Sequence, residues 1–140
     1  MKDKFFLDTN LLVYSFDPAD QAKRKRALEL IEEGVLSRRG VISYQVVQEF
    51  LNLAFRKFTR PLSEGDARDY YRKILKPLCA VHSSSKLFAR ALTVHEDTQY
   101  HWYDSLIVAA ALESDCSVLY TEDLGHKHKV ESLTIVNPFK

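Results

Sequence analysis

The sequence predicts a single α/β domain built around a parallel sheet. Two observations lead to this class. Short apolar runs typical of buried strands alternate with longer segments that carry apolar residues at helical spacing. Strands that alternate with helices pair in parallel, because each crossover helix returns the chain to the same end of the sheet. The 140 residues suffice for one domain with a sizeable core, and we expect it to span residues 1–140.

Five strands are expected, each a short apolar run bounded by polar or turn-forming residues. The first run is followed directly by Asp8, Thr9 and Asn10, which leaves no room for a long loop. Asp123 closely follows the fourth run in a similar way. The five runs cover residues 5–7, 40–43, 78–81, 117–120 and 133–136.

The first two helices are expected between the first and second strands. One covers residues 11–16, with Thr9 or Asn10 as its candidate N-cap. The other begins after Asp20 and continues to about residue 33. Gly34 is suited to end it, because glycine readily adopts the left-handed conformation found after a helix C-terminus.

The later helices are predicted from apolar periodicity and from their end signals. A helix at 44–58 carries a broad apolar face, and another begins at Ser63 and should stop at Pro77. A further helix begins near 83–85. Residues 106–112 are apolar on every side, which indicates a helix buried between the sheet and its neighbours.

Composition and charge favour a soluble, cytoplasmic globular protein. The hydrophobic content is 46%, and the longest apolar run is far shorter than the roughly 20 residues that span a bilayer. The charged first residues run straight into Phe5, without a visible secretory signal. Cys79 and Cys116 lack a metal-ligand spacing, so we expect free thiols in a reducing compartment. The net charge of +1 indicates no class of partner.

Four carboxylates can share one cleft at the carboxyl edge of this sheet. Asp8 and Asp123 both follow strands, and parallel strands end at the same edge. Asp104 begins the buried helix that leads into the fourth strand, and such a helix starts at that edge too. Glu49 lies in the opening turns of the helix after the second strand, and helical side chains lean toward the helix N-terminus.

Clustered carboxylates repel one another unless hard cations lie among them. Mg²⁺ and Mn²⁺ prefer oxygen ligands, and a cation held there could activate water and stabilise charge on a phosphodiester. We therefore expect a Mg²⁺ or Mn²⁺ site at the four acids. Short polar side chains near the same edge could orient ligands or waters, namely Thr9, Asn10, Ser43 and Thr121.

Four segments, in this order along the chain, resemble the PIN domain and specifically its toxin-like, VapC-type branch. They are Phe-Leu-Asp-Thr-Asn at 6–10, Gln-Glu-Phe at 48–50, the run from Tyr103 to Ala111, and Leu-Tyr-Thr-Glu-Asp-Leu at 119–124. The resemblance implies a three-layer α/β/α sandwich with a five-stranded parallel sheet. It also implies a ribonuclease that depends on Mg²⁺ or Mn²⁺. Carried over by residue, the catalytic and metal-binding acids are Asp8, Glu49, Asp104 and Asp123, supported by Ser43 and Thr121.

The resemblance further implies partners. These are single-stranded or structured RNA, a small antitoxin whose tail blocks the cleft, and a second copy of the chain in a homodimer. One departure follows Asp123, where a second closely spaced acid is replaced by the basic segment 125–129. Lys127 and Lys129 in this segment, together with His101, are candidates for contact with RNA.

Two other functions remain open. Aspartyl-phosphate phosphoryl-transfer enzymes also place an acid after the first strand, although their common phosphatase form has a second acid where this chain has Asn10. A non-catalytic binding protein could retain the same fold. Each acid taken singly also has a structural explanation, since Asp104 could cap its helix and Glu49 could be solvated.

Overall fold

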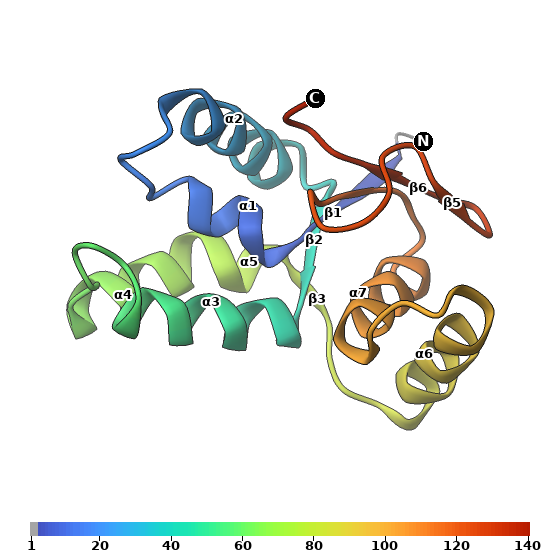
Figure 1. The fold of residues 1–140 in the computed structure, drawn as a ribbon. Helices are drawn as coiled ribbons and strands as arrows, with labels where there is room; N and C mark the ends of the chain where they lie inside the picture. Colours follow the sequence, from blue (N-terminus) through green and yellow to red (C-terminus); the bar gives the residue numbers. More distant parts are fainter. Residues whose placement is uncertain (1–2) are drawn as a thin grey trace.

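A computed structural model describes residues 3–140, so the first two residues of the predicted domain lie outside the described part. A twisted sheet occupies the centre, with helices on either side (Figure 1). The strand order is β3-β2-β1-β4-β6-β5. The predicted α/β class, with a mostly parallel central sheet, is confirmed.

The five predicted strands are all present, and all of them pair in parallel. A sixth strand was not expected. It is a two-residue strand that pairs antiparallel with β6 and begins at Lys129, the last residue of the predicted basic segment. The strands are β1 (Lys4–Leu7), β2 (Gly40–Ser43), β3 (Cys79–Val81), β4 (Cys116–Tyr120), β5 (Lys129–Val130) and β6 (Leu133–Val136).

The helices fall into two groups. Figure 1 shows α1 to α5 gathered on one side of the sheet and α6 with α7 on the other. This division follows from right-handed crossovers, because the chain steps from β1 through β2 to β3 in one direction and then returns past β1 to β4. The elements are α1 (Thr9–Tyr14), α2 (Gln21–Ser37), α3 (Tyr44–Arg56), α4 (Glu64–Tyr70), the π-helix η1 (Tyr71–Leu75), α5 (Lys76–Leu78), α6 (Ser85–Thr98) and α7 (Trp102–Glu113).

Helix α7 is buried as the sequence predicts. All residues from Ser105 to Leu112 are buried, because the helix packs against β4 and β2 on one side and against α6 on the other. The central strand β1 is equally enclosed, with Phe5, Phe6 and Leu7 all in the core. The first turn of α7 and the end of β1 are therefore held by well-packed elements.

The prediction for the start of α1 was wrong by one to two residues. The N-cap is Asp8, not Thr9 or Asn10, and its carboxylate accepts a hydrogen bond from the backbone N–H of Thr9. The helix therefore begins directly after the strand. An aspartate is among the best N-caps because its oxygen satisfies an otherwise unpaired N–H group.

Gly34 does not end α2, contrary to the prediction. The helix continues to Ser37, and Arg38 adopts the left-handed conformation with φ of 62°. Gly34 instead lies where α2 passes closest to β2, because a Cβ built on Gly40 would lie 2.5 Å from the Gly34 Cα atom. The glycine serves a close approach of two backbones, not a turn.

Pro77 does not stop its helix at once, because it lies within the short helix α5. The preceding π turn η1 breaks the regular spacing of backbone hydrogen bonds. A new helical turn then starts at Lys76, and proline is tolerated in a first turn because the N–H that it lacks has no helical partner there.

Both cysteines are free, with Cys116 buried and Cys79 half-buried. Of the helices within residues 3–140, none is both long enough and apolar enough to cross a membrane.

Candidate functional site

The carboxyl edge of the sheet opens into a cleft of about 490 Å³. Its lining residues come from the end of β1, from α1, from α3, from the first turns of α7 and from the segment after β4. All four acids singled out in the sequence line it, namely Asp8, Glu49, Asp104 and Asp123. The fold thus brings together side chains from four separate parts of the chain.

Asp8 is the most enclosed of the four acids, with an exposed fraction of 7%. One carboxylate oxygen accepts a hydrogen bond from the Thr9 N–H at 2.7 Å, and the other accepts one from the Thr121 hydroxyl at 2.8 Å. Burial, with smaller contributions from the charges of Asp123 and Glu49, raises the pKa of Asp8 to about 7 despite these two bonds. Loss of water outweighs two good hydrogen bonds, which is the behaviour expected of a carboxylate that lacks a cation.

Glu49 is held through both of its carboxylate oxygens. The Thr9 hydroxyl donates to one oxygen at 2.7 Å, and the Gln45 side-chain amide lies 3.5 Å from the other. The same Gln45 amide donates to the backbone carbonyl of Tyr103 at 3.2 Å, so it joins α3 to the first turn of α7. Thr9 was expected to help orient ligands, and in the structure it orients Glu49.

Gln45 was missed by sequence reasoning, although it is buried and lines the cleft. A signal for it was present, because Gln45 precedes Glu49 by one helical turn and residues at that spacing face the same side. The amide could not be assigned a role before its second partner, the Tyr103 carbonyl, was located.

Asp123 is positioned by two polar neighbours. The Asn10 amide nitrogen donates to an Asp123 carboxylate oxygen at 3.1 Å, and the Asp123 N–H donates to the Thr121 hydroxyl at 3.2 Å. Thr121 therefore contacts both Asp8 and Asp123. The Asn10 Oδ1 atom is buried and has no hydrogen-bond partner within residues 3–140, so it is an acceptor that the described chain leaves unsatisfied.

Asp104 lies in the first turn of α7, but it does not cap the helix. His101 is at the N-cap position, without a side-chain capping bond. Partial burial raises the pKa of Asp104, and the nearby charges of Asp123 and Glu49 add to this, while His101 opposes it. The charges of the acids across the cleft therefore act on the Asp104 carboxylate, while the N-cap position belongs to His101.

Ser43 differs from the other predicted polar supports. It is buried at the end of β2, and it is not among the cleft-lining residues. Its hydroxyl has no hydrogen-bond partner in the described part of the chain. Within residues 3–140, Ser43 therefore makes no hydrogen bond to any of the four acids.

The donor chemistry of the cleft suits a hard divalent cation. Every acid offers carboxylate oxygens, and the unpartnered Asn10 Oδ1 adds a neutral oxygen. In the arrangement described for residues 3–140, no three His, Cys, Asp or Glu side chains are close enough together to form a metal site on their own. Mg²⁺ commonly retains several waters and binds few carboxylates directly, so this spacing is compatible with it.

The PIN domain family model matches residues 5–131, which is most of the chain. The chain belongs to the PIN domain family. The predicted family resemblance is thereby confirmed. Among proteins with curated descriptions, none matches this PIN domain significantly.

Several solved structures share the fold of this PIN domain. One is a toxin–antitoxin complex from Klebsiella pneumoniae, with a TM-score of 0.67, 17% identity, and coverage of 96% of this chain and 98% of that chain. A second is FitAcB from Neisseria gonorrhoeae, with a TM-score of 0.66 and 16% identity. The match covers 96% of this chain and 98% of that chain. A third is VapC20 from Mycobacterium tuberculosis, a toxin that cleaves the sarcin–ricin loop, with a TM-score of 0.59 and 18% identity. The match covers 86% of this chain and 90% of that chain.

Glu122 was not considered in the sequence, although it adjoins Asp123. It accepts a hydrogen bond from the Tyr14 hydroxyl and pairs with Lys23 at 2.9 Å. The Lys23 ammonium also lies over the Tyr14 ring, 4.6 Å from its centroid. These contacts join α1 and α2 of the PIN domain to the segment after β4. Glu122 therefore has structural partners that differ from those of Asp123.

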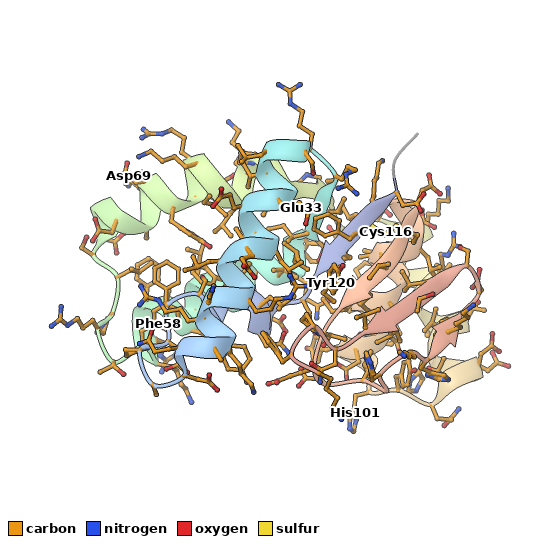
Figure 2. All side chains as sticks on the ribbon, turned by 90° about the horizontal axis from the view of Figure 1, so that it is seen from above. Glu33, Phe58, Asp69, His101, Cys116 and Tyr120 are labelled. Carbon is orange, nitrogen blue, oxygen red and sulfur yellow. The ribbon has the colours of Figure 1, made fainter. Side chains whose placement is uncertain are left out.

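The three predicted RNA-contacting residues are exposed, but none lines the cleft. Figure 2 shows His101 at the outer surface of the molecule. Lys127 and Lys129 lie on the connection that folds back onto β6, where the Lys127 N–H donates to the Ile135 carbonyl. Their side chains face solvent beyond Asp123 along the chain.

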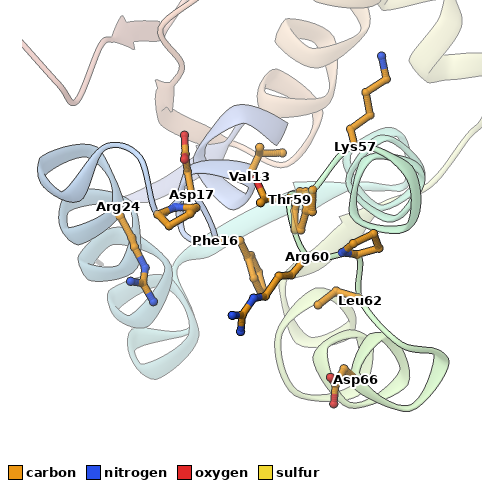
Figure 3. Close-up of a pocket in the computed structure, with 12 residues that line it drawn as sticks. Val13, Phe16, Asp17, Arg24, Lys57, Thr59, Arg60, Leu62 and Asp66 are labelled. Atoms are coloured by element: carbon orange, nitrogen blue, oxygen red, sulfur yellow. The ribbon is translucent and has the colours of Figure 1, made fainter.

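A larger pocket of about 850 Å³ lies next to the cleft and shares Val13 with it. It is formed by the α1–α2 and α3–α4 connections of the PIN domain (Figure 3). Phe16 and Leu62 contribute apolar surface, and the guanidinium groups of Arg24 and Arg60 extend toward the same region. The pocket does not contain the clustered acids, so the smaller cleft is the candidate site.

Proposed function

We propose that this PIN domain is a metal-dependent endoribonuclease that hydrolyses RNA phosphodiester bonds, and that it is the toxin of a type II toxin–antitoxin pair. The observation that carries the proposal is the cleft that four carboxylates from separate parts of the chain line together. The raised pKa of Asp8 supports it, because this acid is buried without a positive partner.

In this proposal Asp8, Asp104 and Asp123 hold Mg²⁺ or Mn²⁺ partly through waters that the ion retains, and Glu49 holds a second ion or positions water. A bound divalent cation supplies a Lewis acid for the phosphodiester and lowers the pKa of a bound water. Thr121 fixes the orientation of the Asp8 carboxylate, and Thr9 fixes that of Glu49. Asp8 and Glu49 thus each have a hydrogen-bonded support that sets the direction of the carboxylate before substrate arrives.

Asn10 supports Asp123 and leaves a buried carbonyl oxygen without a partner. We propose that this oxygen accepts a hydrogen bond from the attacking water or from a ribose hydroxyl. Either donor would satisfy an acceptor that is costly to leave unpaired.

The toxin part of the proposal includes a small antitoxin as partner. The solved structures of similar fold include a toxin–antitoxin complex and a sarcin–ricin loop cleaving toxin. The pocket in Figure 3 offers apolar surface directly beside the cleft, where a partner could bind and also reach the acids. A homodimer and a cytoplasmic location belong to the same proposal.

The direct test is cleavage of mixed RNAs in the presence of Mg²⁺ or Mn²⁺, with and without excess EDTA. We expect cleavage in single-stranded regions, because unstacked nucleotides can enter a narrow cleft, and we expect EDTA to abolish it. The Asp8→Asn variant, purified in parallel, controls for contaminating ribonuclease. Cleavage that continues unchanged in EDTA would exclude the metal mechanism.

The basic residues after Asp123 give a second prediction, namely that Lys127→Gln with Lys129→Gln weakens RNA binding and reduces its salt dependence. The slope of log affinity against log salt is negative, and the loss of two phosphate contacts should make it shallower by about 1.4. The matched control is Lys73→Gln with Lys76→Gln, two exposed lysines near the amino end of β3, at the opposite edge of the sheet. Equal slopes in both double variants would remove the basic segment from the binding surface.

A further inference from the structure

We propose that the Tyr103 ring is a stacking platform for a nucleobase next to the cleaved phosphodiester. This inference rests on the proposed ribonuclease function and names how the site would hold a single strand. Tyr103 is 67% exposed, yet it lines the cleft together with Asp104 and Glu49. An exposed aromatic ring that lines a cleft offers a flat face on which the ring of a ligand can stack.

The exposure of Tyr103 contrasts with the rest of its helix. The residues from Ser105 to Leu112 are all buried in α7. Four other tyrosines of the domain pack against an aromatic partner, namely Tyr14, Tyr70, Tyr100 and Tyr120. Tyr103 has neither such a ring partner nor a hydrogen bond to its hydroxyl within residues 3–140. Of the tyrosines exposed without a ring partner in the described chain, Tyr103 differs from Tyr71 in that it lines the cleft.

The backbone beneath the ring is fixed. The Gln45 amide donates to the Tyr103 carbonyl at 3.2 Å, and Gln45 itself is only 6% exposed. Helix α7 continues from there into the core. A ring mounted on rigid backbone loses little conformational freedom when a base stacks on it, so more of the contact energy appears as affinity.

Stacking suits the kind of substrate proposed. Every base has a π-face, so an aromatic platform binds single strands with little sequence preference. Because Tyr103 adjoins Asp104 in sequence and shares its cleft, a phosphate placed at the acids puts a neighbouring base within reach of the ring. A protein segment could also contact an exposed tyrosine, and the test separates the two.

The test compares Tyr103→Ala, Tyr103→Leu and Tyr103→Phe. Binding of a fluorescein-labelled single-stranded RNA is measured by anisotropy with Mn²⁺ in the Asp8→Asn background, and KM and kcat are measured without that change. Loss of one stacked base should raise Kd and KM by about 5- to 150-fold in the Ala and Leu variants, with kcat within about twofold. Tyr103→Phe retains the ring and should stay within about twofold of the parent.

Two controls make the result specific. Tyr71→Ala removes an aromatic that is 42% exposed on η1, outside the cleft lining, and should leave Kd unchanged. An RNA with an abasic site beside the mapped cleavage position removes the base instead of the ring, so the effect of Tyr103→Ala should vanish on it.

Four outcomes would overturn the inference. They are a Leu variant that binds like the parent, an Ala effect that persists on abasic RNA, a Phe variant as weak as Ala, and an Ala variant that loses only binding of a co-expressed antitoxin. A parent protein that neither binds nor cleaves RNA with Mn²⁺ would instead overturn the proposed function itself. Melting temperatures measured for every variant identify any that fail to fold.

Discussion

The metal-free protein is expected to lose stability as the pH rises from about 4 to about 7, and Asp8→Asn is expected to remove most of that loss. The folded-state pKa of Asp8 is about 7, above the value of 3.8 for a free side chain. In that range the unfolded chain has released the proton while the folded chain retains it, so stability falls as pH rises. The change is on the order of 4 kcal/mol, and it should level off above pH 7.

Urea unfolding in EDTA, followed through the single tryptophan, measures this at several pH values. Asp69→Asn is the matched control, because Asp69 is exposed on α4 and, among residues 3–140, forms an ion pair with Arg72 alone. That variant should keep the wild-type pH slope. A wild-type protein whose stability rises over this range, or an Asp8→Asn variant with the same slope, would contradict the burial of an unpaired carboxylate.

Asp104→Asn is expected to lower RNA cleavage by at least about 100-fold while leaving the fold intact. In the proposed site the variant loses a charged metal ligand, so Mg²⁺ or Mn²⁺ should raise its melting temperature less than that of the wild type. The metal-free variant should gain up to roughly 1 kcal/mol from relief of like-charge repulsion, a modest figure because the carboxylate is only partly buried.

Asp66→Asn is a close positional control, because Asp66 is the third residue of α4 just as Asp104 is the third residue of α7. Both substitutions remove a charge that is favourable near a helix N-terminus. Differential scanning fluorimetry across a metal titration compares them. If the metal-induced shifts of both variants equal the wild-type shift and cleavage survives in both, Asp104 serves its helix alone.

The sequence was sufficient to place the acids at one edge of the sheet. Asp8 and Asp123 follow parallel strands, and such strands must end at the same edge, so their approach is a consequence of topology. Asp104 could be placed because α7 is apolar on all sides and must lead into β4. These inferences depend on the order and direction of elements, which apolar patterns encode directly.

Contacts that depend on exact side-chain geometry could not be predicted. Gln45 looks like any polar residue of an amphipathic helix until the Tyr103 carbonyl is located beside it. Glu122 and Lys23 are far apart in the sequence, and their pairing follows from how α2 packs against the rest of the domain. Gly34 lies in a helix interior although glycine disfavours helix. Its close packing against Gly40 outweighs this low helix propensity.

The short strand β5 has a consequence for how copies of this protein could associate. It pairs with β6 through only two residue pairs, and the opposite margin of the sheet is the three-residue strand β3. Free backbone N–H and C=O groups along a long outer strand would invite another chain to add to the sheet. Here both margins are too short to template such an addition. A stable dimer of this domain would therefore have to bury side chains of its helices, and its affinity would depend on those side chains and not on shared backbone hydrogen bonds.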